Sequence, residues 1–330
     1  MRRPPPLRTY SHLADKGQVP SEYQIVSSRL LYHPERGFET NVPLASWYQR
    51  HQREGQLRCA DWEAFADPRE TTYSKYTRLA AHNEQHLDAV AHSIEGTAHD
   101  AKLAPAWSAV IERVLPPLRY VWHGFQMMAA YVGQMAPSGR ITLVALFQAG
   151  DEMRRIHRIA QRMDQLQQRQ PDFGADALAQ WQEDRAWQPL RKVVEHGLVA
   201  YDWGESFAAL CLCIKPFCDL LLVEFAALAR QHGDYFSSEI LGSFAQDARW
   251  HRSWAAQLVA LLLSEGEPGR AAGNRAVLTA WLNQWLPPAR SAARAVASLF
   301  GDDQGLASVA RAENEVLLWL RGLGLAEAAT

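Results

Sequence analysis

The chain has 330 residues, which is enough for one large domain or two smaller ones with a sizeable core. Its 34 Lys and Arg residues nearly balance its 36 Asp and Glu residues and leave a net charge of −2. This balance argues against a protein that binds nucleic acid or an anionic membrane by charge alone. The 12 Trp residues favour a large core or a protein–protein contact.

The first 45 residues differ in composition from the rest of the chain. They contain six prolines among scattered aromatic and polar residues, and no helical period is evident. A segment of this kind is too short to build its own core. We therefore expect an extended N-terminal arm over residues 1–45 that is either loosely ordered or laid across another surface, followed by one helical domain over residues 46–330.

Neither the arm nor the helical domain carries a sign of export or membrane insertion. Met1–Pro6 lacks the apolar stretch of a signal peptide, and the longest apolar run, residues 207–229, is interrupted by charged residues and a proline. The cysteines form no C-x-x-C pair, so we expect reduced core residues in a cytoplasmic protein. They are Cys59, Cys211, Cys213 and Cys218.

From residue 46 onward the apolar pattern is helical and no stretch alternates as a strand does, which predicts an all-α fold. The first long helix is expected over residues 67–96, with Asp67 as N-cap and Pro68 at the first helical position. The next segment contains Pro116 and Pro117, where the helix should bend or break. The further segments are 105–136, 139–169, 176–184, 186–201, 202–232, 235–265, 274–300 and 306–321.

Several of these helices are about 30 residues long, and long helices joined by short loops pack as bundles. The segment 202–232 is apolar on nearly every face, so other helices should surround it. Bundles of this type can hold a di-iron centre built from two Glu-x-x-His pairs and two further Glu residues. No Glu in this chain is followed three residues later by His.

Two segments come close to the metal-binding pattern. Asp151–Arg155 has Glu152, but Arg155 stands at the histidine position; Asp247–His251 has the histidine, but Ala248 stands at the glutamate position. Neither a guanidinium nor an alanine can bind a metal ion, so we expect no metal, cofactor or catalytic residue in this chain. Inward carboxylates then need neutralisation, which predicts contacts of Glu152 with Arg155 and of Asp247 with His251.

Short motifs spread over most of the chain match those of one family. In chain order they are Arg8–Ala14, Pro20–Tyr23, Trp47–Tyr48, Asp61–Pro68, Pro117–Tyr120, Gln126–Met127, Gln134–Pro137, Asp202–Glu205, Lys215–Pro216 and His251–Trp254. With them the chain resembles the β (small) subunit of the hydroxylase component of bacterial multicomponent di-iron monooxygenases. The toluene and o-xylene type is the most similar.

The resemblance implies a ferritin-like helical subunit of an α2β2γ2 hydroxylase. In that family the α subunit carries the di-iron centre and hydroxylates an aromatic hydrocarbon with O2. A regulatory effector protein docks on the hydroxylase, and a Rieske ferredoxin with its NADH-linked reductase supplies electrons. The chain itself would be non-catalytic. Its implied partner-binding residues are Tyr10, His12, Tyr23, Trp47 and Tyr48.

Three alternatives remain open at this stage. The chain could serve a phenol, alkene or isoprene monooxygenase of the same family. It could also be a self-sufficient di-iron protein that uses Glu152, Glu205 and His251, or a helical adaptor with no oxygenase partner. The substrate and its regiospecificity would depend on the α subunit.

Overall fold

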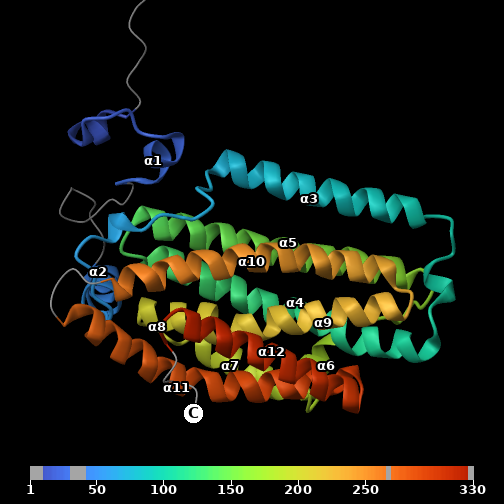
Figure 1. The fold of residues 1–330 in the computed structure, drawn as a ribbon. Coiled ribbons are helices and arrows are strands. Elements are labelled where there is room, and N and C mark those ends of the chain that lie inside the picture. Colours follow the sequence, from blue (N-terminus) through green and yellow to red (C-terminus); the bar gives the residue numbers. More distant parts are fainter. Residues whose placement is uncertain (1–9, 30–41, 265–268, 326–330) are drawn as a thin grey trace, which may run out of the picture.

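The computed structural model describes residues 10–29, 42–264 and 269–325, and within these ranges all regular secondary structure is helical (Figure 1). This confirms the all-α prediction. The long helices run side by side along one axis of the bundle. In chain order the helices are α1 (Glu22–Ser27), α2 (Val42–Tyr48), α3 (Tyr73–Ile94), α4 (Pro105–Met135), α5 (Gly139–Gln167), α6 (Ala177–Glu183), α7 (Gln188–Gly197), α8 (Trp203–Phe207), α9 (Lys215–Gln231), α10 (Tyr235–Leu263), α11 (Arg270–Ala297) and α12 (Asp302–Gly322).

The predicted start of the first long helix was wrong. Helix α3 begins at Tyr73, and the Thr72 hydroxyl caps it by accepting a hydrogen bond from the Lys75 N–H. Asp67 instead holds the preceding turn, because its carboxylate accepts the backbone N–H groups of Arg69 and Thr71. An aspartate next to a proline fits a turn as well as a helix start, and only the tertiary contacts decide between them.

Helix α4 runs without a break through Pro116 and Pro117. A proline at position 117 cannot donate to the carbonyl of Arg113 one turn earlier, which normally weakens a helix. Here the Arg113 carbonyl accepts a hydrogen bond from the Trp187 indole N–H at 3.1 Å. The tertiary contact replaces the missing helical donor at this carbonyl, and the predicted break does not occur.

The segment 202–232, which was expected to be central, is surrounded by other helices of the bundle. It consists of α8, a π-helical stretch (Ala208–Ile214) and α9, and every residue of the π-helical stretch is buried. Trp203–Gln231 is long and apolar enough to cross a bilayer, but 94% of its most apolar window is buried inside the bundle. That burial is typical of the core helix of a soluble protein. The Cys211 and Cys213 thiols belong to this core, and all four cysteines are free.

Part of the N-terminal arm contains short helices that the sequence did not predict. Residues 11–16 form a 3-10 helix, and α1 begins with a capping box between Ser21 and Gln24. Tyr23 is buried, and its hydroxyl accepts the Asp67 N–H at 3.0 Å. Arg140, at the start of α5, donates a hydrogen bond to the Ser28 hydroxyl at 2.8 Å. The described part of the arm therefore packs against its own chain.

Helix α3 forms an outer layer above α5 and α10 (Figure 1). Of its side chains only Leu87 is fully buried, so little apolar surface holds it in place. Polar side chains of α3, among them Tyr76 and Glu84, also contact the bundle and lead to a group of buried charges.

Candidate functional site

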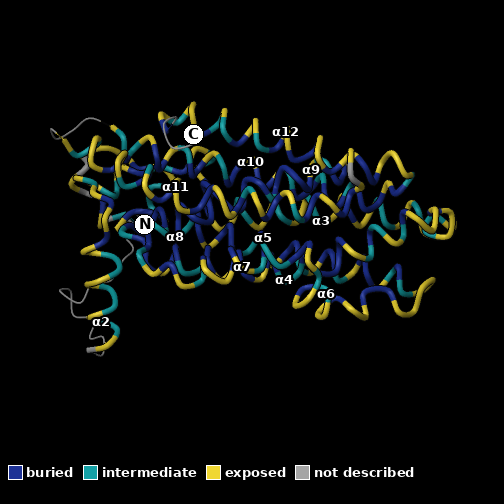
Figure 2. The backbone as a smooth tube through the Cα atoms, turned by 90° about the horizontal axis from the view of Figure 1, so that it is seen from below, coloured by how far each residue is buried: buried dark blue, intermediate teal, exposed yellow. Residues whose placement is uncertain are grey.

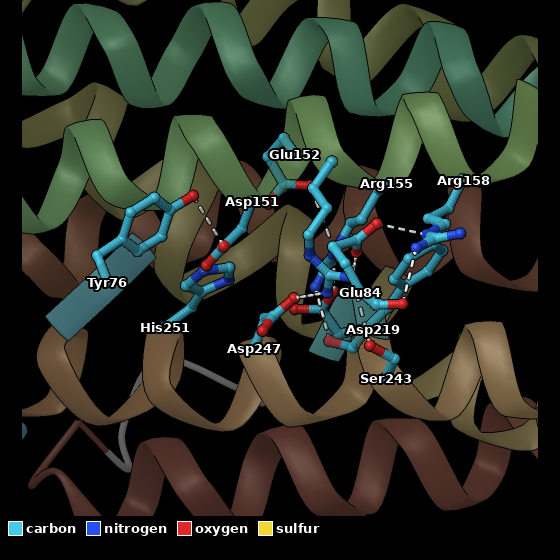
Figure 3. A network of polar contacts seen from close by, with 12 residues as sticks. Tyr76, Glu84, Asp151, Glu152, Arg155, Arg158, Asp219, Ser243, Asp247 and His251 are labelled. Carbon is cyan, nitrogen blue, oxygen red and sulfur yellow. Dashed lines mark hydrogen bonds and ion pairs between the residues drawn. The ribbon is translucent and has the colours of Figure 1, made fainter. Parts of the chain in front are cut away.

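Helices α5 and α10 bring the two near-miss segments face to face at the centre of the bundle (Figure 3). The His251 Nε2 lies 3.0 Å from the Asp151 carboxylate, and Arg154 pairs with Asp247 one turn away. Asp151 faces His251, and the later residue Arg154 faces the earlier residue Asp247, so the two helices are antiparallel. Residues 151–155 and 247–251 thus form one site.

The predicted contact between Asp247 and His251 was wrong. Each of the two side chains finds its partner on α5 rather than one turn along its own helix. Burial, together with the charges of Lys215 and Arg155, lowers the pKa of His251 well below its usual value. A neutral imidazole attracts a carboxylate weakly, and the Arg154 guanidinium therefore neutralises Asp247 better than His251 would.

The predicted pair of Glu152 and Arg155 is confirmed, with 3.3 Å between their charged atoms and both side chains fully buried. Helix α9 adds two residues that the sequence motifs did not assign to the site. The Lys215 ammonium lies 2.7 Å from Glu152 and 3.0 Å from Asp219, and Arg155 lies 2.9 Å from Asp219. Lys215 and Asp219 are visible in the sequence as charges four residues apart in an apolar run, which is the spacing of a helical ion pair.

The charges of Glu152, Arg155, Lys215 and Asp219 balance one another, and all four side chains are buried. Burial alone would raise the pKa of Asp219, but Lys215 and Arg155 outweigh it and hold that pKa below the usual value. Burial likewise opposes the charge of Arg155, and Glu152 and Asp219 more than offset it and raise the pKa of Arg155. Asp219 and Arg155 are therefore expected to be ionised at neutral pH.

A second set of polar contacts ties helix α3 to this centre. The Tyr76 hydroxyl lies 3.1 Å from Asp151, and Glu84 pairs with Arg154 and Arg158 of α5. Burial is the main cause that raises the pKa of Asp151 and of Tyr76. Burial and the nearby charge of Asp151 raise the pKa of Asp247 to about 6.

The centre does not fit a metal ion. In the part of the chain that the structure describes, no three His, Cys, Asp or Glu side chains are placed to hold one. The ammonium and guanidinium groups lie against the carboxylates that could otherwise act as ligands, and neither group has a lone pair to offer. Ala248 is buried and carries no ligand atom.

The ligand set of the self-sufficient di-iron alternative does not come together. Glu205 is hydrogen-bonded to Gln284 and Trp285 of α11, whereas Glu152 and His251 contact residues of α5 and α9. The arrangement of charges at the centre can fasten α5, α9 and α10 together.

The low pKa of His251 predicts a pH effect on stability. Below about pH 6.5 the unfolded chain binds a proton at this histidine that the folded chain cannot bind, so stability falls as the pH falls. The fall is at most about 1.4 kcal/mol per pH unit. Urea unfolding from pH 7 to 5 should show a steeper loss for the native chain than for His251→Gln. Equal slopes would contradict the prediction.

The five predicted partner-binding residues lie in different settings. Tyr23 is buried, Tyr10 is half-buried and His12 is exposed. The Trp47 indole N–H donates to the Tyr131 hydroxyl at 3.2 Å, and its ring packs edge-on against Tyr201. Tyr48 is half-buried against the core. The contact of these residues with a partner stays a prediction.

Comparison with known proteins points to one family. The model of a family described as methane/phenol/alkene hydroxylase matches residues 45–266. The β subunit of the hydroxylase component of the toluene-4-monooxygenase system from Ectopseudomonas mendocina is 33% identical over 310 residues, which cover 90% of this chain and 92% of the relative.

Two solved structures share the fold. A chain from toluene 4-monooxygenase, solved with toluene bound in the resting active site, matches with a TM-score of 0.82 and 30% identity. That match covers 92% of this chain and all of the other. A chain of phenol hydroxylase from Pseudomonas sp. OX1 matches with a TM-score of 0.83 over 98% of this chain and 97% of the other, at 21% identity.

Proposed function

This chain belongs to the methane/phenol/alkene hydroxylase family, and we propose that it is the non-catalytic β subunit of the hydroxylase component of a toluene-type multicomponent monooxygenase. One observation carries the non-catalytic role. At the centre of the bundle, Arg155 and Lys215 lie against the carboxylates of Glu152 and Asp219, where a metal-binding relative would need free ligands.

In this proposal the chemistry belongs to a partner. An α subunit of the same family would hold the di-iron centre and hydroxylate an aromatic hydrocarbon with O2 in an α2β2γ2 assembly. A regulatory effector protein would dock on that assembly, and a Rieske ferredoxin with its reductase would deliver electrons in the cytoplasm. The residues of this chain would stabilise the assembly and take no part in the reaction.

Two features of the structure support a role in assembly. Helix α2 projects from one end of the bundle (Figure 2), and it carries Trp47 and Tyr48. Tyr201, which packs against Trp47, keeps 42% of its surface exposed. Large aromatic side chains on a projecting, half-exposed element are frequent centres of protein–protein contacts. We propose this aromatic end as one surface that binds the α subunit.

Co-expression with the candidate α and γ chains tests this function. A tag on this chain should retain the α chain in constant proportion through affinity purification and size-exclusion chromatography. Recovery of this chain alone, while the α chain elutes separately and folded, would count against the proposal.

Removing residues 1–40 should weaken the assembly and leave the bundle folded. The helical domain holds nearly all of the buried apolar residues, so the circular dichroism of the truncated chain should keep its helical shape. Its retention of the α chain should drop clearly. Ser28→Ala is the matched control, because it loses only the hydrogen bond from Arg140 and keeps the arm. An unchanged complex after truncation would exclude a role for the arm.

A further inference from the structure

Four charged side chains close a ring at the centre of the bundle. Glu152 contacts Lys215 at 2.7 Å, Lys215 contacts Asp219 at 3.0 Å, Asp219 contacts Arg155 at 2.9 Å, and Arg155 returns to Glu152 at 3.3 Å. We call these four residues the ion ring. Two carboxylates from α5 and α9 therefore share two cations, and the formal charges of the ring sum to zero.

Two side chains at the ion ring that could bind a metal ion each have one polar atom without a hydrogen-bond partner in the described part of the chain. The His251 Nδ1 and the Asp219 Oδ2 are buried and have no hydrogen-bond partner among the described residues. Both residues border one small space that is too narrow for a water molecule, together with Lys215 and Gln148. Buried polar atoms nearly always find a partner, so these two atoms are exceptions beside the ion ring and keep lone pairs that a metal ion could use.

We propose that the Lys215 ammonium and the Arg155 guanidinium act as built-in counter-ions that take the place of metal ions and exclude divalent cations from the carboxylates of Glu152 and Asp219. A divalent ion would have to displace the ammonium from Glu152 and Asp219 and leave that charge buried without a partner. Breaking a buried pair in this way is strongly unfavourable.

The geometry indicates which changes would return the site to metal binding. Arg155→His places a histidine three residues after Glu152, and Ala248→Glu places a glutamate three residues before His251. Each change restores one Glu-x-x-His pair on a helix that already faces the other. Lys215→Gln then removes the ammonium and leaves Asp219 free to contribute from α9.

The test uses full-length chains and Co²⁺ as the probe, followed by its visible absorption and by equilibrium dialysis. The native chain should bind no Co²⁺ at the centre. The triple variant Arg155→His, Lys215→Gln, Ala248→Glu should bind at least one ion per chain. The double variant that keeps Lys215 should bind at least about tenfold more weakly, since the ammonium still competes. Adding His251→Ala to the triple variant should abolish the absorption.

Three results would overturn the proposal. The first is that the native chain binds Co²⁺ and loses this binding on His251→Ala. The second is that the double and triple variants bind Co²⁺ with equal affinity. The third is that the triple variant folds and binds no Co²⁺. If the triple variant does not fold, Lys215→Gln alone carries the test, because it leaves the ion ring with one uncompensated negative charge. Co²⁺ should then raise the Tm of Lys215→Gln and not that of the native chain, and equal shifts would refute the inference.

Discussion

Arg155→Met should lower the free energy of unfolding by about 3–5 kcal/mol, because it breaks a buried ion pair and leaves the other charges without compensation. Methionine keeps most of the side-chain volume, so the loss reports charge more than packing. Arg155 is fully buried and also donates a hydrogen bond to the Phe244 carbonyl on α10 at 2.9 Å. Urea denaturation followed by circular dichroism measures the change.

Arg191→Met is the control for this experiment. Arg191 forms an ion pair with Glu195 one turn along α7, but both side chains are substantially exposed. A pair of this kind contributes about 0–1 kcal/mol. If the two variants lost similar stability, the ion ring would not be an important source of stability.

Arg162→Met should cost about 3–5 kcal/mol for a related reason. The Arg162 side chain is fully buried and donates two hydrogen bonds of 2.8 Å to Asp100, in the connection between α3 and α4. It also pairs at 3.1 Å with Asp234, the residue that caps α10. One guanidinium therefore fastens three parts of the chain at this end of the bundle.

Arg158→Met, one turn earlier on α5, provides the matched comparison. Its carboxylate partners Glu84 and Asp88 are 32% and 66% exposed, so water can compensate for the lost pairs. We expect a loss about half as large or smaller, given the small contribution of exposed pairs. Thermal unfolding of both variants side by side distinguishes the two positions, and a larger loss for Arg158→Met would contradict this interpretation.

The sequence predicted the helices well because long helices leave a strong apolar period. Residues 139–169 were expected to be helical, and α5 spans Gly139–Gln167 with Ser138 as its cap. Predictions that depended on tertiary contacts were less successful. At Pro117, the donor missing from the helix is supplied by Trp187, which lies 74 residues after Arg113. No local pattern in the sequence indicates this contact.

At the candidate site, too, a contact within one helix was predicted correctly and contacts between helices were not. The i, i+3 spacing correctly predicted the pair of Glu152 and Arg155, since both residues lie on one helix. The partners of Asp247 and His251 depend on how α5 and α10 face each other, and a single sequence does not contain that register. The role of Lys215 was missed because a charge in an apolar run argues first against a membrane span and does not reveal its partner on another helix.

The location of iron tests the central claim most directly. The chain should be purified alone and in complex with its α partner, and iron should be measured per mole of each chain. We predict iron in the complex in proportion to the α chain, and none above background in this chain alone. Stoichiometric iron in the isolated chain, lost on His251→Ala, would contradict a non-catalytic subunit whose centre is neutralised by Arg155 and Lys215.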